Sequence, residues 1–378
     1  MLLRDSISGF LNNIQKKLFP LLEEELGPLT EKHQKLIRTL EMLRIEEFVK
    51  LQYGYRGRPE KDRKVLSRAY VAKAVYNITE TKKLIDKILT DRTLREICGW
   101  SSLGEVPSES TFSRVFSEFS NNKLPQVVHE SLIKRSYSNY IVGHVSRDST
   151  AIEAREKPVW NKEKRELPKY KRGRPKKGEE REKEFSRLEK QVNMTLEEML
   201  EDLPKSCDKG NKVDSKGYKK TWTGYKFHID SGDGDVPLSC ILTSASVHDS
   251  QVALPLAGIT NQRVVNLYDL MDSAYDSPII REHSRLLNHV PIIDINPRRN
   301  IELKLRLKQE SKCLKILNKK MPESLRYNER SSVERVNGRL KDEFGGRDIR
   351  VRGHLKVMTH LMFGILALTI DQLCRFTL

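Results

Sequence analysis

Three acidic residues stand where predicted strands or a helix would present a carboxylate. Asp148 ends the first predicted strand, and Asp272 follows an apolar, strand-like run. Glu334 lies in a charged segment with helical periodicity. Converging carboxylates make an oxygen-rich site for hard cations such as Mg²⁺, and two such ions about 3.5–4 Å apart could activate water for phosphodiester cleavage. Because the chain contains 52 acidic residues, any one of them taken alone is expected to be a solvated surface carboxylate.

The segment around Glu334 gives a sharper test of this idea. At about 100° per residue, four of its residues fall within an arc of roughly 60° on one helix face: Tyr327, Arg330, Glu334 and Lys341. A metal-binding Glu334 flanked by Arg330 and Lys341 would suit a phosphate backbone, because guanidinium and ammonium groups bind phosphate oxygens. The alternative is an exposed helix stabilised by spaced ion pairs, since Arg335 and Arg339 are also charged.

The elements that would carry these residues alternate between strands and helices after residue 140. Strands are predicted from Tyr140 to Asp148 and over 222–229, 237–246, 263–270 and 290–295, with the turn-rich 230–235 joining the second to the third. Helices are predicted over 249–258, 327–344 and 355–376. This succession predicts an α/β fold, a mixed sheet flanked by helices.

The N-terminal part of the chain has a different pattern. Apolar residues recur at helical spacing through 10–135, and Ser110-Thr111 before Phe112 marks a further helix start. We therefore predict an all-helical N-terminal domain over 1–135 and an α/β domain over 136–378.

A basic insert interrupts the second domain at about 155–220. Its core, 162–177, has a net charge of +7 and no apolar periodicity, so it is expected to stay solvated until it meets a partner. Within it, Arg172-Gly173-Arg174-Pro175 suits a hook in the DNA minor groove or, equally, a flexible linker. The same letters recur at Arg56-Gly57-Arg58-Pro59, where a proline opening a helix is the competing explanation.

Composition narrows the class of partner. The 378 residues carry 69 Lys+Arg against 52 Asp+Glu, and the net charge of +17 points to nucleic acid or, as a rival, to a membrane surface. No secretory signal is expected, and the longest apolar run, 361–370, is too short to span a bilayer and is predicted to be a buried helix. Five scattered cysteines favour a reducing compartment. The sequence has no phosphate-binding Gly-x-x-x-x-Gly-Lys loop, so no nucleotide cofactor is implied.

The helix pattern Tyr327-x2-Arg330-x3-Glu334-x6-Lys341 resembles the signature of one large group of bacterial insertion-sequence transposases. These are DDE enzymes with an RNase H-like catalytic domain. Four further segments look like the family's other blocks, in order: 147–150, 224–229, 242–250 and 272–277. The resemblance covers about 140–370.

This resemblance implies a role for each matched residue. Asp148, Asp272 and Glu334 would be the catalytic triad, binding two Mg²⁺ ions for which Mn²⁺ would substitute. Arg330 and Lys341 would contact DNA, supported by Tyr327. Asp269 and Asp276 compete for the place of the second acid, and Asp272 is preferred because it directly follows the strand and precedes Ala274-Tyr275 as in the family block. His228 and His248 would line the active site or, with equal weight, be core and edge histidines.

The resemblance also implies an activity. The chain is expected to be a cytoplasmic DNA transposase that binds the ends of its insertion sequence, cleaves a strand and transfers it, as a homodimer on paired ends of double-stranded DNA. The N-terminal helices would recognise the terminal DNA, with Arg56, Arg58 and Arg114 as phosphate contacts. The alternatives are a transposon-derived DNA-binding protein without catalysis and an RNase H-fold nuclease.

The interval between the second acid and the glutamate departs from some relatives. These place a β-rich insertion there, with a tryptophan that handles a flipped base. Here the interval contains no tryptophan, since the three in the chain are Trp100, Trp160 and Trp222. A tryptophan-assisted hairpin step is therefore not carried over, and substitution by Trp160 or Trp222 stays open.

Overall fold

The computed structural model describes residues 3–50, 61–159, 185–213 and 217–377. Arg56, Arg58, Arg172, Arg174 and Trp160 lie outside the described residues. The N-terminal part is helical, as predicted. Its elements are α1 Leu3–Asn13, η1 Ile14–Leu18, α2 Phe19–Leu26, α3 Glu31–Leu43, η2 Ile45–Phe48, α4 Arg63–Val75, α5 Thr81–Thr90, α6 Arg92–Cys98, η3 Leu103–Glu105, α7 Glu109–Asn121 and α8 Leu124–Tyr137.

An aromatic cluster holds these helices together. Phe112, Phe116 and Phe119 recur on one face of α7 and are buried. They surround Tyr70 of α4 with ring centroids 5.0 to 6.2 Å apart, and the Tyr70 hydroxyl donates a hydrogen bond to the Phe112 carbonyl at 2.7 Å. Phe363, from the far end of the chain, packs on Tyr70 at 5.6 Å. The core of the N-terminal helices therefore includes the last helix of the protein.

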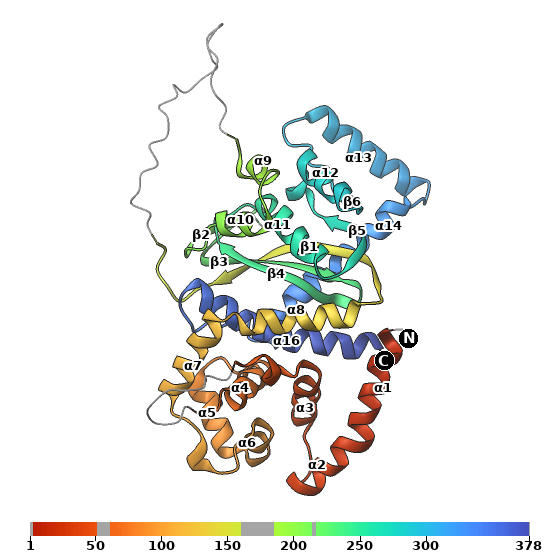
Figure 1. The fold of residues 1–378 in the computed structure, drawn as a ribbon. Coiled ribbons are helices and arrows are strands. Elements are labelled where there is room, and N and C mark those ends of the chain that lie inside the picture. Colours follow the sequence, from red (N-terminus) through yellow and green to blue (C-terminus); the bar gives the residue numbers. More distant parts are fainter. Residues whose placement is uncertain (1–2, 51–60, 160–184, 214–216, 378) are drawn as a thin grey trace.

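That last helix, α16 (His354–Thr377), runs between the N-terminal helices and the sheet (Figure 1). Taken as a whole, the helix from His354 to Arg375 is long and apolar enough to cross a membrane by length and composition, whereas the apolar run 361–370 within it is as short as expected. Polar residues on both sides of the apolar run continue the helix and supply the extra length. Since 89 % of its apolar 18-residue window is buried inside the protein, α16 has the burial of a core helix, which confirms the prediction of a buried helix at 361–370.

The sheet is mixed, as predicted. Its strands are β1 Ile141–Glu153, β2 Asp208–Val213, β3 Lys219–Gly232, β4 Val236–Ser244, β5 Val265–Met271 and β6 Val290–Ile293. The strand order is β2-β3-β1-β5-β6, and β4 also pairs with β3. β3 lies antiparallel to β1, β2 and β4, whereas β1, β5 and β6 are parallel.

The sheet extends further than the sequence indicated. β1 continues to Glu153 because its antiparallel ladder with β3 runs on to Gly224, and β3 itself extends through Gly232 into the expected turn. The basic insert contains two short helices, α9 Arg187–Gln191 and α10 Leu196–Asp202, and the unpredicted edge strand β2. β2 alternates no apolar residues. Gly210 lets it lie against the Trp222 ring, since a Cβ there would be 2.4 Å from a ring carbon.

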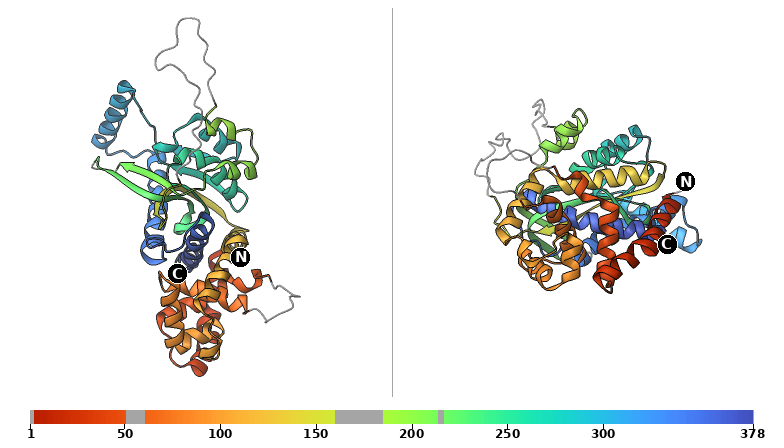
Figure 2. Two further views of the ribbon diagram at one scale, coloured as in Figure 1. Left: turned by 90° about the vertical axis from the view of Figure 1, so that its left-hand side faces the viewer. Right: turned by 60° about the horizontal axis from the view of Figure 1, so that its bottom comes forward.

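Helices cover both faces of the sheet (Figure 2). Successive side chains of β1 point to opposite faces. Arg147 points towards α11 (Ala253–Asn261), where it pairs with Asp230, which also accepts a hydrogen bond from Thr260. Ser146 points the other way and donates to the Glu329 carbonyl just before α15 (Ser331–Glu343). The remaining elements are η4 Asp233–Asp235, η5 Asp249–Val252, η6 Ser273–Tyr275, α12 Pro278–Leu286, α13 Ile301–Ile316, α14 Pro322–Tyr327 and η7 Asn328–Arg330.

Candidate active site

Two of the predicted acids lie beside each other at the end of a parallel ladder. The pairing of β1 with β5 ends at Arg147 and Met271, so the next residue on each side is an acid, Asp148 and Asp272. Asp148 is not at the end of its strand as predicted, because β1 continues along β3 with Asp148 opposite Ile229. Asp272 leaves β5 and caps η6, accepting a hydrogen bond from the Ala274 backbone N–H at 2.9 Å.

The surroundings of these two carboxyls disfavour negative charge. Burial raises the pKa of Asp148 to about 6, and the carboxylates of Asp272 and Asp249 add to this effect, while Lys212 of β2 opposes it. Burial also raises the pKa of Asp272, with Asp249 adding to it and Arg330 opposing it. The local cations leave the negative charge incompletely balanced. A divalent cation bound by the carboxylate oxygens would balance it, so this donor set fits Mg²⁺.

The two competitors for the second acid have partners of their own. Asp269 is 2 % exposed, and its carboxylate lies 3.2 Å from His289 Nδ1 and 3.0 Å from the Asn266 side-chain nitrogen. Asp276 accepts hydrogen bonds from the guanidinium of Arg281 and from the backbone N–H of Asn296, both at 2.9 Å. Both acids are thereby engaged in holding the loops around them, which favours Asp272 for the candidate site.

The third acid stands apart from the other two. Glu334 pairs with Arg330 at 2.6 Å, and its side chain is 55 % exposed. Among the described residues, no three acidic, histidine or cysteine side chains lie close enough to hold one metal ion. Arg330 interacts electrostatically with both Asp148 and Asp272 as well as with Glu334. The structure therefore brings the two aspartates together, and the Arg330 guanidinium interacts with both of them and with the glutamate.

The helix that carries Glu334 is less regular than predicted. Instead of one α-helix from Tyr327, α14 ends there and the 3₁₀ turn η7 connects it to α15. The Arg330 guanidinium lies 5.7 Å from the centre of the Tyr327 ring, and the Tyr327 hydroxyl donates to Asp294 at 2.6 Å. Its hydrogen bond to Asp294 thus fixes Tyr327, and the Tyr327 ring in turn positions the Arg330 guanidinium.

Lys341 lies further along the same helix, near the end of β1. It is half-buried, and its pKa is lowered by burial and by the charges of Arg347 and Lys212, while Glu153 raises it. Lys212 thus brings the edge strand β2 into a group of cations beside the acids. The alternative of a helix stabilised by spaced ion pairs also describes this segment in part, because Glu334 pairs with Arg330 and Glu343 with Arg339, each four residues apart. Arg335 pairs instead with Asp235 of η4.

The sequence interpretation missed Asp249, which follows β4 and affects both aspartates electrostatically. Its Oδ1 accepts a hydrogen bond from the Ser149 hydroxyl at 2.7 Å and lies 3.2 Å from the Lys226 ammonium. The same oxygen is 3.8 Å from Nδ1 of His228, which is fully buried. The sequence feature that could have identified Asp249 is its position after a predicted strand, within the matched block 242–250.

The open alternatives at His228, His248 and Trp222 now have structural answers. Burial lowers the pKa of His228 to about 4, and its Nε2 lies 3.0 Å from the Thr243 hydroxyl, so it is a core histidine next to Asp249. His248 is exposed and caps η5 by accepting the backbone N–H of Ser250. Trp222 is 9 % exposed and donates its indole N–H to the Tyr225 carbonyl at 3.0 Å. Its ring therefore packs within the sheet.

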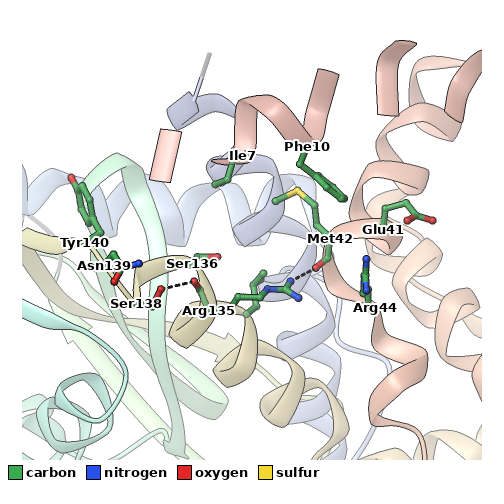
Figure 3. A pocket seen from close by; sticks show the side chains of 11 residues that line it. Ile7, Phe10, Glu41, Met42, Arg44, Arg135, Ser136, Ser138, Asn139 and Tyr140 are labelled. Atoms are coloured by element: carbon green, nitrogen blue, oxygen red, sulfur yellow. Dashed lines mark hydrogen bonds between the residues drawn. The ribbon is translucent and has the colours of Figure 1, made fainter. Parts of the chain in front are cut away.

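Arg114 lies outside this neighbourhood, on α7. It is exposed, and its guanidinium contacts the Ser110 carbonyl and the Thr111 hydroxyl, each at 3.4 Å. A pocket between α1, α3 and α8 carries none of the predicted site residues (Figure 3). In it, Arg135 donates to the Met42 carbonyl at 2.6 Å, so this cation joins α8 to α3. Neither feature contributes to the arrangement of the acids.

Comparison with known proteins gives two matches. The family model of the transposase DDE domain matches residues 143–370, from the start of β1 into α16. A second family model, a transposase domain (DUF772), matches residues 22–118 among the N-terminal helices. No curated protein and no solved structure matches the chain.

Proposed function

Because the chain belongs to the transposase DDE domain family, whose model matches more than half of it, we propose that it is a DNA transposase that cleaves and transfers strands at the ends of its insertion sequence. Membership confirms the resemblance noted from the sequence and the RNase H-like fold. The family suggests a DNA-cleaving and DNA-transferring enzyme. The observation that carries the proposal is the juxtaposition of Asp148 and Asp272, two carboxyls with raised pKa, at the end of the β1–β5 ladder.

Asp148, Asp272 and Glu334 would hold two Mg²⁺ ions, with Mn²⁺ able to replace them. When bound, such ions supply Lewis-acid activation of the attacking hydroxyl and stabilise the leaving oxygen. The raised pKa of both aspartates supports this assignment, because two partly buried carboxyls side by side favour a cation in place of protons. Glu334 would join them by exchanging its pairing with Arg330.

The cations of the site would bind the DNA. Arg330, freed from Glu334 and held against the Tyr327 ring, would contact the phosphate being attacked. Lys341, further along α15, would contact the same DNA strand. Water attack on phosphorus breaks the P–O3′ bond and leaves a 3′-hydroxyl. That hydroxyl then attacks a phosphorus of the target strand and displaces its 3′-oxygen, without a covalent bond to the protein.

The rest of the chain would select and position the DNA. In this proposal the helical domain over 1–135 recognises the terminal repeats through Arg114, Arg56 and Arg58. Within the catalytic domain over 136–378, Arg172 and Arg174 of the basic insert bind the minor groove. Two copies act as a homodimer on paired ends. Acting on chromosomal DNA implies a cytoplasmic location.

A cleavage assay on duplex DNA carrying the sequence that flanks the gene tests this function. We expect Mg²⁺-dependent nicking at the element end by the wild-type protein, and none by Asp272→Asn, with DNA binding retained by the variant. Asp276→Asn is the matched control in the same loop, and its cleavage should persist. Undiminished cleavage by Asp272→Asn would overturn the site assignment.

Substrate choice separates the transposase from its alternatives. Cleavage of any duplex regardless of end sequence would favour the nuclease, and binding without cleavage in Mg²⁺ or Mn²⁺ would favour the non-catalytic DNA-binding protein. Short inverted repeats on either side of the gene support the transposase.

A further inference from the structure

Helix α13 (Ile301–Ile316) lies between the second acid and the glutamate in the sequence and has no buried residue. It projects from the catalytic domain beyond α12 and β6, which is clearest in the side view of Figure 2. Helices of soluble proteins usually bury one face, since packing rather than propensity supplies most of their stability. A 16-residue helix in which no side chain is fully buried therefore has a surface available to a partner.

One face of α13 is a row of lysines. At about 100° per residue, four lysines fall within an arc of about 80°, a group we call the lysine face: Lys304, Lys308, Lys312 and Lys315. With a rise of 1.5 Å per residue the row is about 16 Å long. All four side chains are exposed. The less exposed leucines of the helix, Leu303, Leu307 and Leu314, lie about a third of a turn away.

These lysines have no acidic partner among the ion pairs of the described residues. The acid Glu310 pairs instead with Arg306, which lies outside the arc. Positive charge on the lysine face is therefore not neutralised by an ion pair within the part of the chain that the structure describes. Lysine is a compact charge on a flexible stem, which suits contact with a run of phosphates without fixed geometry.

Both ends of α13 are attached next to the candidate active site. Before the helix, Asp294 accepts the hydrogen bond from Tyr327, and the Arg298 guanidinium donates to the Asp276 carbonyl at 3.2 Å. After the helix, α14 leads directly into Tyr327 and Arg330. DNA bound at the acids therefore has α13 as a neighbour.

We propose that the lysine face of α13 binds the phosphate backbone of duplex DNA next to the strand held at Asp148 and Asp272. A DNA strand carries one phosphate per about 3.4 Å of helix axis, so a 16 Å row offers each lysine a phosphate. Contact through lysines to phosphates positions the duplex and carries no sequence information. The identity of the ligand as DNA rests on the proposed function.

Salt dependence of binding tests the lysine face directly. The full-length protein is titrated with a fluorescent duplex carrying the flanking sequence, and with a duplex of scrambled sequence, between about 50 and 200 mM salt. Changing the four lysines to glutamine should reduce the slope of log Kd against log salt by about three to four for both duplexes, and raise Kd at least about tenfold at low salt. Changing them to arginine, which keeps the charge, should leave the slope near the wild-type value.

Circular dichroism of the glutamine variant should match the wild type, since glutamine and lysine have similar helix propensity. An unchanged slope in a folded glutamine variant would overturn the inference, and so would an altered oligomeric state with unaltered DNA binding, which would assign the face to a second copy. Asp272→Asn should bind DNA with the full wild-type slope. Failure of the wild type to cleave would count against the proposed function and leave this binding result intact.

Discussion

Arg147 and Asp148 are neighbours on β1, but acids on the two faces of the sheet have opposite electrostatic surroundings. On one face, fully buried Asp230 accepts hydrogen bonds from the Arg147 guanidinium at 2.8 and 2.7 Å and from Thr260 at 2.6 Å. On the other, Asp148 lies beside Asp272, and its pKa rises to about 6. A buried acid with its own guanidinium has its charge balanced within the fold, whereas an acid next to another acid has its charge balanced by a cation from solution.

The largest expected effect is on catalysis, on replacing Asp148, the acid whose charge nearby cations do not fully balance. Asp148→Asn should lower the cleavage rate at least about a thousandfold, equivalent to about 4 kcal/mol, because an amide is a poor metal ligand. In EDTA the same variant should be more stable than the wild type at pH 7, by about 1–3 kcal/mol, since a buried charge has been removed. Urea unfolding and cleavage assays measure the two effects. A variant destabilised in EDTA would break the comparison.

Asp230, whose charge is balanced by Arg147, should show the opposite change in the free energy of unfolding when it is replaced. Asp230→Asn removes the hydrogen-bonded counterion of buried Arg147, which then keeps the weaker electrostatic interaction with Asp269, so the free energy of unfolding should fall by about 3–5 kcal/mol. Urea unfolding in EDTA checks this value. Replacing both partners, Arg147→Met with Asp230→Leu, should recover much of the loss, because the uncompensated charge is then absent. A single variant as stable as the wild type would contradict a structural role for the pair.

A pH titration of the wild type, compared with that of Asp148→Asn, separates the two faces. Because the folded-state pKa of Asp148 is raised to about 6 from its ordinary value of 3.8, its contribution to stability is full below about pH 4 and is lost as the pH rises through 6. The melting temperature in EDTA should therefore fall over this interval in the wild type and less in Asp148→Asn. Saturating Mg²⁺ should abolish the fall, since the cation replaces the proton. An identical pH profile with and without Mg²⁺ would argue against a metal at Asp148.

Local patterns predicted much of this arrangement, but not the contacts that depend on distant pairing. The strand before Asp272 and the segment around Glu334 were found from apolar runs and helical spacing. The position of Asp148 within a longer β1 depends on β3, some 80 residues away in the register Asp148 to Ile229. α13 was not predicted, because apolar and charged residues alternate from Ile301 to Lys308 with the period of a strand.

Asp249 is the intermediate case, an acid near the unbalanced pair that has a cation of its own. Burial raises its pKa, but the charges of His228 and Lys226 and the hydrogen bond from Ser149 leave the pKa below its usual value. Ser149→Ala removes that bond while Lys226 stays 3.2 Å away, so we expect a loss of only about 1 kcal/mol in unfolding free energy.

If Asp249 belongs with the balanced acids, Mg²⁺ affinity measured by calorimetry should change by less than about threefold in Ser149→Ala, or less than about 0.7 kcal/mol. A fall in affinity as large as that of Asp148→Asn would place Asp249 with the metal-binding pair instead. Asp249 would then belong with the acids that bind a cation, and Asp230 with those whose charge the protein balances. The two groups of acids would no longer correspond to the two faces of β1.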